Sequence, residues 1–144
     1  MSTLEVRAFE LADRALVINV WQRCGLVVPW NDPERDIARK MRHGREFFLV
    51  GCHEQDLVAT VMGGYEGHRG WINYLAVDPD YQRRGYAEQI VKELELRLVA
   101  AGCPKVNLQV RATNSAVVAF YEKIGYIQDA NISFGKRLIV DHID

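Results

Sequence analysis

The sequence predicts one domain of the α+β (mixed α/β) class, with a mixed, mostly antiparallel sheet flanked by helices. Strand-like stretches, either alternating or continuously apolar, are interspersed with stretches whose apolar residues recur at helical spacing. Short turns join the early strand-like stretches and a long helical stretch separates two later ones, which indicates hairpins followed by a β-α-β unit with a right-handed crossover. A length of 144 residues fits a single core, so residues 1–144 are expected to form one domain.

The first third of the chain is expected to form one strand and two helices. Residues 4–9 alternate between apolar and polar side chains, as in a half-buried strand. The apolar residues that follow lie on one helical stripe: Val17, Val20, Trp21 and Cys24. Gly25 ends this helix. A second helix begins at Asp32, a capping carboxylate followed by a proline at the first helical position, and runs to about residue 43.

The middle of the chain predicts three strands. Residues 46–52 and 57–65 are strand-like and are separated by a polar turn, which indicates a hairpin. After a second turn at residues 66–70, residues 71–77 form a nearly continuous apolar run, as expected of a central strand covered on both faces. Asp78 and the proline after it end that strand.

The last third begins with the most regular helical pattern, over residues 85–101. Its apolar residues recur at helical spacing: Ala87, Ile90, Val91, Leu94, Leu98 and Ala101. We expect a strand at residues 105–110, a helix at residues 114–124, and two closing strands at residues 126–127 and 132–140. The predicted order is therefore β-α-α-β-β-β-α-β-α-β-β.

The charge balance and the cysteines exclude several classes of function. The chain has 18 Lys and Arg against 19 Asp and Glu, a formal charge of -1, so it has no domain-wide basic field for nucleic acid. Its three cysteines form no Cys-x-x-Cys pair, which disfavours a disulfide framework and a structural zinc site. No segment approaches the roughly 18 apolar residues that span a bilayer, and residues 1–7 carry no signal pattern. We expect a cytoplasmic protein without metal, nucleic acid or membrane partners.

Residues 82–87, with the sequence QRRGYA, lie between the apolar strand and the most regular helix. Amides at a helix start have no internal partner and the helix dipole adds positive charge there, so a turn of small residues can bind a pyrophosphate. Gly85 permits close approach of the backbone, and Ala87 leaves the first turn uncrowded. By itself the hexapeptide is also compatible with a basic surface turn. The sequence contains neither the Gly-x-Gly-x-x-Gly motif nor a P-loop.

Two motifs together resemble the GNAT superfamily of N-acetyltransferases. Residues 75–79 (LAVDP), followed by Gln82-x-x-Gly85-x-Ala87, are similar to that family's Gln/Arg-x-x-Gly-x-Gly/Ala signature. Asn114 at a helix start and residues 121–126 (YEKIGY) are similar to its second signature. The predicted order of elements agrees with the family too, so the resemblance covers essentially the whole chain. It implies a small stand-alone member of bacterial type, with a V-shaped gap between the fourth and fifth strands.

The resemblance implies that acetyl-CoA binds in this gap. The strand at residues 75–77 would pair with the pantetheine arm, the amides of residues 83–87 would hold the pyrophosphate, and Tyr121 would lie beside the sulfur. The residues that the resemblance assigns to the cofactor are Leu75, Ala76, Val77, Gln82, Arg83, Arg84, Gly85, Tyr86, Ala87, Asn114 and Tyr121. Seven residues at about 100° each return Tyr121 to within roughly 20° of Asn114, on one helix face. Tyr121 also fits a core aromatic.

The implied reaction is direct attack of a primary amine on the thioester, without a covalent enzyme intermediate. A free lysine with a pKa near 10.4 is neutral in only about one molecule in 2500 at pH 7, so desolvation or a base must help. A backbone amide of residues 75–77 would, by the resemblance, stabilise the oxyanion. Tyr121 is the expected acid for the departing thiolate.

The general base is where the sequence departs from many members of the family. These carry a glutamate on the fourth strand, but residues 71–77 contain no carboxylate. Glu66, with His68 in the same turn, is the candidate base, and both also fit solvated turn residues. A water chain that ends on Tyr74 or Asn73 is an alternative.

In the family, the loop between the first two helices and the last hairpin shape the acceptor pocket, which here means residues 24–31 and 128–131. The candidate acceptor-binding residues are Trp30, Asn31, His68 and Asp129. Trp30, together with Trp21, could line an apolar site or belong to the core. Protein N-termini, protein lysines, polyamines, amino acids and aminoglycoside-like amines all remain open as acceptors, as do longer acyl groups as donors.

The expected function is therefore an acetyl-CoA-dependent N-acetyltransferase whose partner is a small-molecule or peptide amine. The alternative is a catalytically inactive CoA or acyl-CoA sensor or partner-docking module, favoured by the missing strand carboxylate. Many domains of this family pair through terminal strands, so the resemblance also allows a homodimer.

Overall fold

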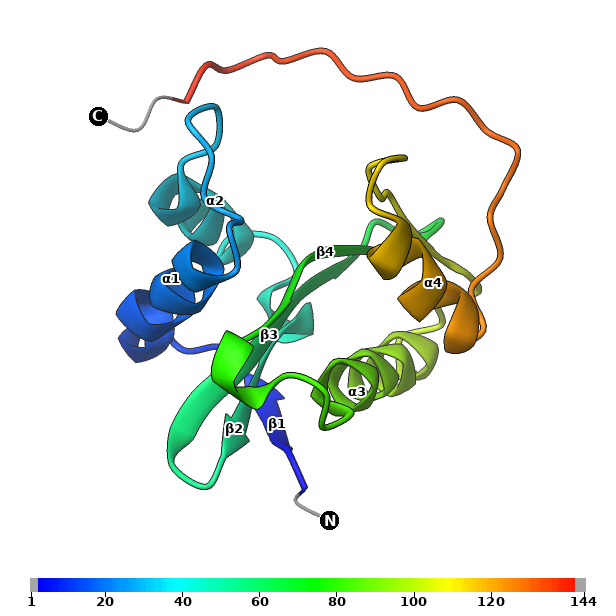
Figure 1. Cartoon of the computed structure of the whole chain (residues 1–144). Coiled ribbons are helices and arrows are strands. Elements are labelled where there is room, and N and C mark those ends of the chain that lie inside the picture. Colours follow the sequence, from blue (N-terminus) through cyan, green and yellow to red (C-terminus); the bar gives the residue numbers. More distant parts are fainter. Residues whose placement is uncertain (1–2, 142–144) are drawn as a thin grey trace.

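The computed structural model describes residues 3–141 and contains one five-stranded sheet (Figure 1). The strands lie side by side in chain order: β1 (Glu5–Ala8), β2 (Phe48–His53), β3 (Asp56–Tyr65), β4 (Gly70–Val77) and β5 (Val106–Leu108). Neighbours are antiparallel except β4 and β5, which are parallel. The predicted class, a mixed and mostly antiparallel sheet, is confirmed.

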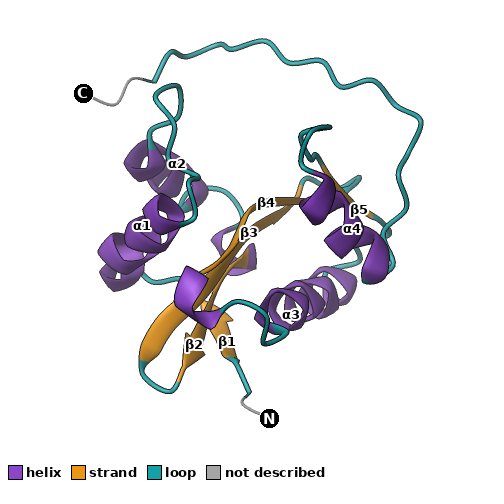
Figure 2. Cartoon of the chain, in the orientation of Figure 1, coloured by secondary structure: helices purple, strands orange, loops and turns teal. Residues whose placement is uncertain are grey.

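Four α-helices cover the two faces of the sheet (Figure 2). They are α1 (Arg14–Arg23), α2 (Pro33–Lys40), α3 (Tyr86–Ala100) and α4 (Ser115–Lys123). The buried residues of α1 and α2 pack with one set of strand residues, and those of α3 and α4 pack with the other set. Because side chains alternate along a strand, one sheet can supply both cores. No helix in this part of the chain is long and apolar enough to cross a bilayer.

Local sequence explains how two of these helices begin. The Asp32 carboxylate accepts hydrogen bonds from the backbone amides of Glu34 (3.0 Å) and Arg35 (3.3 Å), as its position before Pro33 predicted. The Asn114 side chain caps α4 in the same way, through the Val117 amide at 3.3 Å. Such caps provide hydrogen-bond acceptors for amides that would otherwise lack a partner.

The sheet and α3 approach each other closely at one glycine. A Cβ atom built on Gly63 of β3 would lie 2.5 Å from Leu94 Cδ1 and 3.0 Å from the Phe47 carbonyl oxygen. Leu94 is completely buried, so it has no room to withdraw. The glycine is therefore a packing requirement rather than a turn signal.

β4 is paired differently along its length. Its first three residues, Gly70 to Ile72, pair with β5, whereas the ladder with β3 continues to Val77. From residue 73 onward, no described strand pairs with the edge of β4 that faces β5. The sheet is thus open beside residues 73–77, which is where the V-shaped gap was predicted.

The two closing strands predicted at residues 126–127 and 132–140 are wrong. Residues 127–140 have neither helical nor strand structure, and in Figure 1 they form the orange-to-red chain that arches from α4 toward α2. We call these residues the C-terminal arm. Its apolar side chains are exposed: Ile132 by 83%, Phe134 by 91% and Leu138 by 86%. A strand exists only where its amides and carbonyls find a ladder, and the arm has none within the described residues.

Side chains, rather than a ladder, hold the arm. Asp129 pairs with Lys105 at 3.0 Å, and Ser133 accepts from Gln109 at 2.6 Å. At its end, the buried carboxylate of Asp141 accepts from Arg39 at 2.8 and 2.9 Å. The arm therefore contacts residues on both sides of β5 near its start and is anchored on α2 at its end.

Candidate active site

The turn at residues 82–87 contains two left-handed backbone positions. Arg83 has φ +65° and Gly85 has φ +80°. The Gln82 side chain folds back, donating from Nε2 to the Val77 carbonyl at 3.0 Å, and the Arg84 guanidinium lies 5.0 Å from the centre of the Tyr81 ring. The turn is therefore held from its own ends, and its backbone faces open space.

The backbone amides at the start of α3 are available to an anion. The helix begins after Gly85, which supplies no side-chain cap, in contrast to the caps of α2 and α4. The Gln89 amide donates to the Gly85 carbonyl at 3.1 Å, so the amides of Ala87 and Glu88 just before it have no acceptor within the helix. A Cβ on Gly85 would meet nothing within 4 Å. Free amides, a helix dipole and open space together suit a phosphate group.

Tyr86, the first residue of α3, uses its side chain elsewhere. Its ring is buried and its hydroxyl lies 2.7 Å from His53 Nδ1 on β2. Its side chain therefore does not contribute to the turn. The contact ties the first turn of α3 to the sheet, so the amides of the turn have a rigid support.

Tyr121 has a buried ring and a free hydroxyl. The ring packs edge-on against Phe120 and Tyr126, with centroid distances of 5.1 and 5.4 Å. Within residues 3–141 the hydroxyl has no hydrogen-bond partner, yet no buried side-chain oxygen there is left unsatisfied, so this oxygen reaches solvent. Burial raises the pKa of Tyr121 to about 12, so the phenol keeps its proton at neutral pH. Both descriptions of Tyr121, core aromatic and proton donor, fit this placement.

Asn114 starts the same helix, two turns before Tyr121. Its Oδ1 is occupied by the cap of α4, and the residue is exposed. Only its Nδ2 remains to donate a hydrogen bond to a ligand. Asn114 thus keeps one polar group for a cofactor while it holds the helix start in place.

Glu66 and His68 lie in the turn before β4, at the opposite end of that strand from Val77. The Glu66 carboxylate accepts from the backbone amides of His68 and Arg69, both at 2.5 Å. These bonds lower the pKa of Glu66. The carboxylate is thus used to close its own turn, and its lowered pKa makes it a weaker base. Both observations favour a structural role for Glu66, and its assignment as the general base stays a prediction.

The predicted acceptor residues fall into two separate groups. Trp30 lies 5.9 Å from the Arg111 guanidinium, beyond the end of β5, and Asn31 accepts from Arg137 of the arm at 3.4 Å. Asp129 pairs with Lys105, whose carbonyl accepts from Gly70, so Asp129 lies at the end of β4 that carries His68. Trp30 and Asn31 thus lie on the side of the open edge of β4. His68 and Asp129 lie at the opposite end of that strand.

Sequence reasoning missed the polar network around the middle of β4. Tyr74 has φ +50°, and the β3–β4 register shifts there, so that Val61 faces both Tyr74 and Leu75. Thr60 donates to the Tyr74 carbonyl at 2.9 Å and accepts from Trp21 Nε1 at 2.9 Å. This bulge turns the strand just where its edge is open.

The Tyr74 side chain completes that network. Its ring stacks on Trp21 at 3.9 Å, and its hydroxyl donates to the carboxylate of Asp36 on α2 at 2.6 Å. Trp21 is thus a core residue and not a wall of the acceptor site. One signal in the sequence was Thr60, the lone polar residue of the apolar run 58–62; nothing local marked Asp36.

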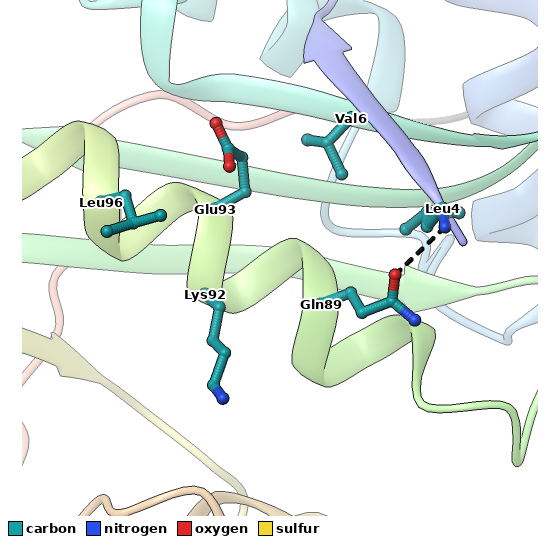
Figure 3. Close-up of a pocket in the computed structure, with 6 residues that line it drawn as sticks. All are labelled: Leu4, Val6, Gln89, Lys92, Glu93 and Leu96. Carbon is teal, nitrogen blue, oxygen red and sulfur yellow. Dashed lines mark hydrogen bonds between the residues drawn. The ribbon is translucent and has the colours of Figure 1, made fainter. Parts of the chain in front are cut away.

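A surface depression of about 350 Å³ lies elsewhere, between β1 and α3 (Figure 3). Six residues line it: Leu4, Val6, Gln89, Lys92, Glu93 and Leu96. The Leu4 amide donates to Gln89 Oε1 at 3.1 Å across its floor. It contains none of the predicted cofactor or acceptor residues.

Comparison with known proteins identifies the family. The model of the acetyltransferase (GNAT) family matches residues 14–126. The chain is 50% identical over 138 residues to a protein of Yersinia pestis (strain Pestoides F) named acetyltransferase, covering 96% of this chain and 98% of that protein.

Two solved structures show the same fold. The ribosomal-protein-S18-alanine N-acetyltransferase of Escherichia coli superposes with a TM-score of 0.72 at 26% identity, covering 85% of this chain and 77% of that one. AAC(6')-Iy, solved with the bisubstrate analogue CoA-S-monomethyl-acetylneamine, gives a TM-score of 0.78 at 11% identity, covering 96% and 100%. The chain belongs to the acetyltransferase (GNAT) family and is an acetyltransferase.

Proposed function

We propose that this acetyltransferase uses acetyl-CoA and transfers its acetyl group to a primary amine. One observation carries the proposal: residues 78–85 are all that separates the uncapped start of α3 from the strand end whose edge is open. A long ligand with a pyrophosphate at one end and a peptide-like arm at the other matches this succession of free amides and unpaired strand. The CoA analogue bound by the fold neighbour AAC(6')-Iy supports the same donor.

The reaction follows from these groups. The neutral amine attacks the thioester carbonyl, forming a C–N bond and a tetrahedral oxyanion, which a backbone amide of residues 75–77 stabilises. The C–S bond then breaks, and the nitrogen, which is positively charged after the attack, loses one proton to water, from which Tyr121 later regains the proton that it gives to the thiolate. The thiolate takes a proton from Tyr121, whose raised pKa keeps that proton available at neutral pH.

A thermal-shift titration tests the donor. At about 100 times its dissociation constant, acetyl-CoA stabilises the native state by about 2.7 kcal/mol, which raises the midpoint by roughly ten degrees in a domain of this size. Arg84→Glu adds negative charge beside the turn and should remove most of this shift. Arg42→Glu, an equal charge change on an exposed residue after α2, is the matched control. A shift with NADH but with no CoA species would contradict the proposal.

Tyr121→Phe tests the proton donor. We expect turnover to fall by about 10²-fold while the dissociation constant of acetyl-CoA stays unchanged, because only the hydroxyl that meets the leaving thiolate is removed. Tyr126→Phe is the control, since the Tyr126 hydroxyl donates to Glu95 at 2.6 Å and serves the fold. Equal turnover in the wild type and in Tyr121→Phe would remove the acid role.

We propose two partners and a compartment. The acceptor is a small-molecule or peptide amine, and the Escherichia coli relative, named for an alanine of a ribosomal protein, supports a peptide. The second partner is another copy of this chain, whose arm would add to the unpaired outer edge of β5, because the arm carries exposed apolar residues in strand-like alternation. The free thiols Cys24, Cys52 and Cys103 fit a reducing cytoplasm.

A further inference from the structure

We infer that Tyr74 and Asp36 form the site that binds the amino group of the acceptor as an ammonium ion. The inference rests on the proposed function and names a recognition site for its second substrate. It starts from the hydroxyl of Tyr74, whose hydrogen is already committed to Asp36 at 2.6 Å. A phenol oxygen that donates its only hydrogen can offer nothing but lone pairs to a further ligand. Such an oxygen accepts from an N–H group and gives nothing to a hydrogen-bond acceptor.

The charges around this hydroxyl favour a cation. Burial raises the pKa of Tyr74 most, and the Asp36 hydrogen bond and the charges of Asp36, Asp32 and Asp141 raise it further, so carboxylates surround this oxygen. Two arginines face these three carboxylates: Arg35 contacts Asp32 at 3.5 Å and Asp141 at 3.3 Å, and Arg39 makes its two short bonds to Asp141. The contact of Arg39 with Asp36 is long, at 3.4 Å, and the Asp36 side chain is about a quarter exposed, at 25%. Asp36 therefore keeps charge that an incoming ammonium can use.

The position of Tyr74 connects this site to the transfer. Tyr74 and Leu75 share the bulge of β4, and their side chains pack on opposite faces of the sheet. The backbone of Leu75 belongs to the open edge that the donor would occupy, whereas the Tyr74 hydroxyl reaches the helices on the other face. An amine held at Tyr74 thus stands beside the bulge where the thioester would lie.

A buried network holds this arrangement rigid. Thr60 and Trp21 are both fully buried and are bonded in series to the Tyr74 carbonyl. The Trp21 ring also stacks on the Tyr74 ring, with only 13° between their planes. Thr60 and Trp21 are positioning residues, because they touch neither substrate and fix both the backbone and the ring of Tyr74.

The site selects and orients the acceptor and does not replace a base. Once one N–H points at the Tyr74 oxygen, the proton lost from the ammonium leaves to water, and the lone pair that remains can meet the thioester carbonyl. An acceptor with an uncharged hydroxyl in place of the amine would gain little from the carboxylates.

Steady-state kinetics with a panel of n-butylamine, 1,4-diaminobutane and an alanyl peptide tests the inference, with CoA release as the signal. In Asp36→Asn and in Tyr74→Phe we expect KM for the amine to rise about tenfold or more, while the dissociation constant of acetyl-CoA stays within twofold. Glu54→Gln removes one exposed acid from the β2–β3 turn and should change neither value. In the wild type KM for the amine should rise with salt, and in Asp36→Asn this dependence should be largely lost.

The outcomes separate this inference from the proposed function. If the wild type binds acetyl-CoA and acetylates an amine, but KM for that amine and its salt dependence are unchanged in both variants, the ammonium site is wrong. If the wild type binds acetyl-CoA and acetylates no amine of the panel, the inference is also overturned. If it binds no CoA species, the proposed function fails, and this inference fails with it.

Discussion

β4 and the C-terminal arm are both rich in apolar residues, but they differ in secondary structure. Residues 70–77 and 132–140 are both short, rich in apolar side chains and strand-like, yet only the first forms a strand. Ile72 of β4 is 4% exposed, whereas Phe134 of the arm is 91% exposed. Apolar patterning therefore indicates which side chains are stabilised by burial, but a strand forms only if its backbone also finds a hydrogen-bonding partner.

β4 pairs with β3 because the two strands are adjacent in the sequence. A turn of four residues, 66–69, joins it to β3, so the hairpin closes at little entropic cost. The arm starts beyond α4, and its end is bound to α2 through Asp141. Its contacts with Gln109 and Lys105 use side chains only.

The largest effect should come from breaking the polar network under β4. Thr60→Val leaves the Trp21 N–H and the Tyr74 carbonyl buried without a partner, and each orphaned group costs about 1–3 kcal/mol. We expect a loss of about 3 kcal/mol in the free energy of unfolding, measured by urea denaturation. Thr60→Ser keeps the hydroxyl and should recover most of this loss. Equal stability of the valine and serine variants would show that the network contributes nothing.

A smaller loss should follow from crowding β3 against α3. Gly63→Ala places a Cβ atom about 2.5 Å from Leu94, which has nowhere to move, so we expect a destabilisation of about 2 kcal/mol in the same assay. Gly135→Ala, in the arm, where an added Cβ meets nothing within 4 Å, is the control and should be nearly neutral. Similar losses of stability in the two variants would contradict the expected difference in packing between β3 and the arm.

Acid should release the arm without unfolding the sheet. Hydrogen bonds from Arg39 lower the pKa of Asp141, so this anchor contributes stability above the ordinary carboxyl pKa of about 4 and loses it as pH falls through the lowered value. Proteolysis or hydrogen exchange at residues 127–140 should therefore increase at acid pH before β4 is affected. Asp141→Asn should show the increase already at neutral pH. An arm equally protected in that variant would mean that other contacts hold it.

The smallest effect on stability is expected within the arm. Phe134→Ser removes a side chain that buries almost nothing, so the free energy of unfolding should change by less than about 0.5 kcal/mol. Light scattering on the wild type and on the same variant measures whether the arm is covered by a second copy of the chain. If a second copy covers the arm, the wild type should have the mass of a dimer and the variant should shift toward the monomer. A large loss of stability in a monomeric protein would show instead that the arm packs on its own sheet.

Much of the architecture could be predicted because its signals are local. The helix starts at Asp32 and Asn114, the end of β4 at Asp78 and the glycine turn before α3 each depend on a few neighbouring residues. The donor side of the candidate site, residues 75–87 and Tyr121, was assigned from motifs that are equally local, through the family resemblance, and stays a prediction. The closing strands were wrong because their outcome depends on an anchor about 100 residues away in the chain, between Asp141 and Arg39.

The acceptor side shows the same limit. Glu66 was the candidate base because it lies in the turn before β4, but its carboxylate is bonded to the amides of that turn. Asp36 was not considered, because 38 residues separate it from Tyr74 and nothing in either local sequence indicates the contact. Thr60 and Trp21 are likewise separated by 39 residues.

By itself the sequence determined the class of fold, the order of its central elements and the turn that suits a pyrophosphate, since caps, glycines and periodicity act within a few residues. Tertiary structure alone decided the bulge at Tyr74, the pairing of its hydroxyl with Asp36 and the unpaired state of the arm. Hydrogen bonds between distant residues form only after the chain has packed, and packing determines which of several available partners each polar group finds.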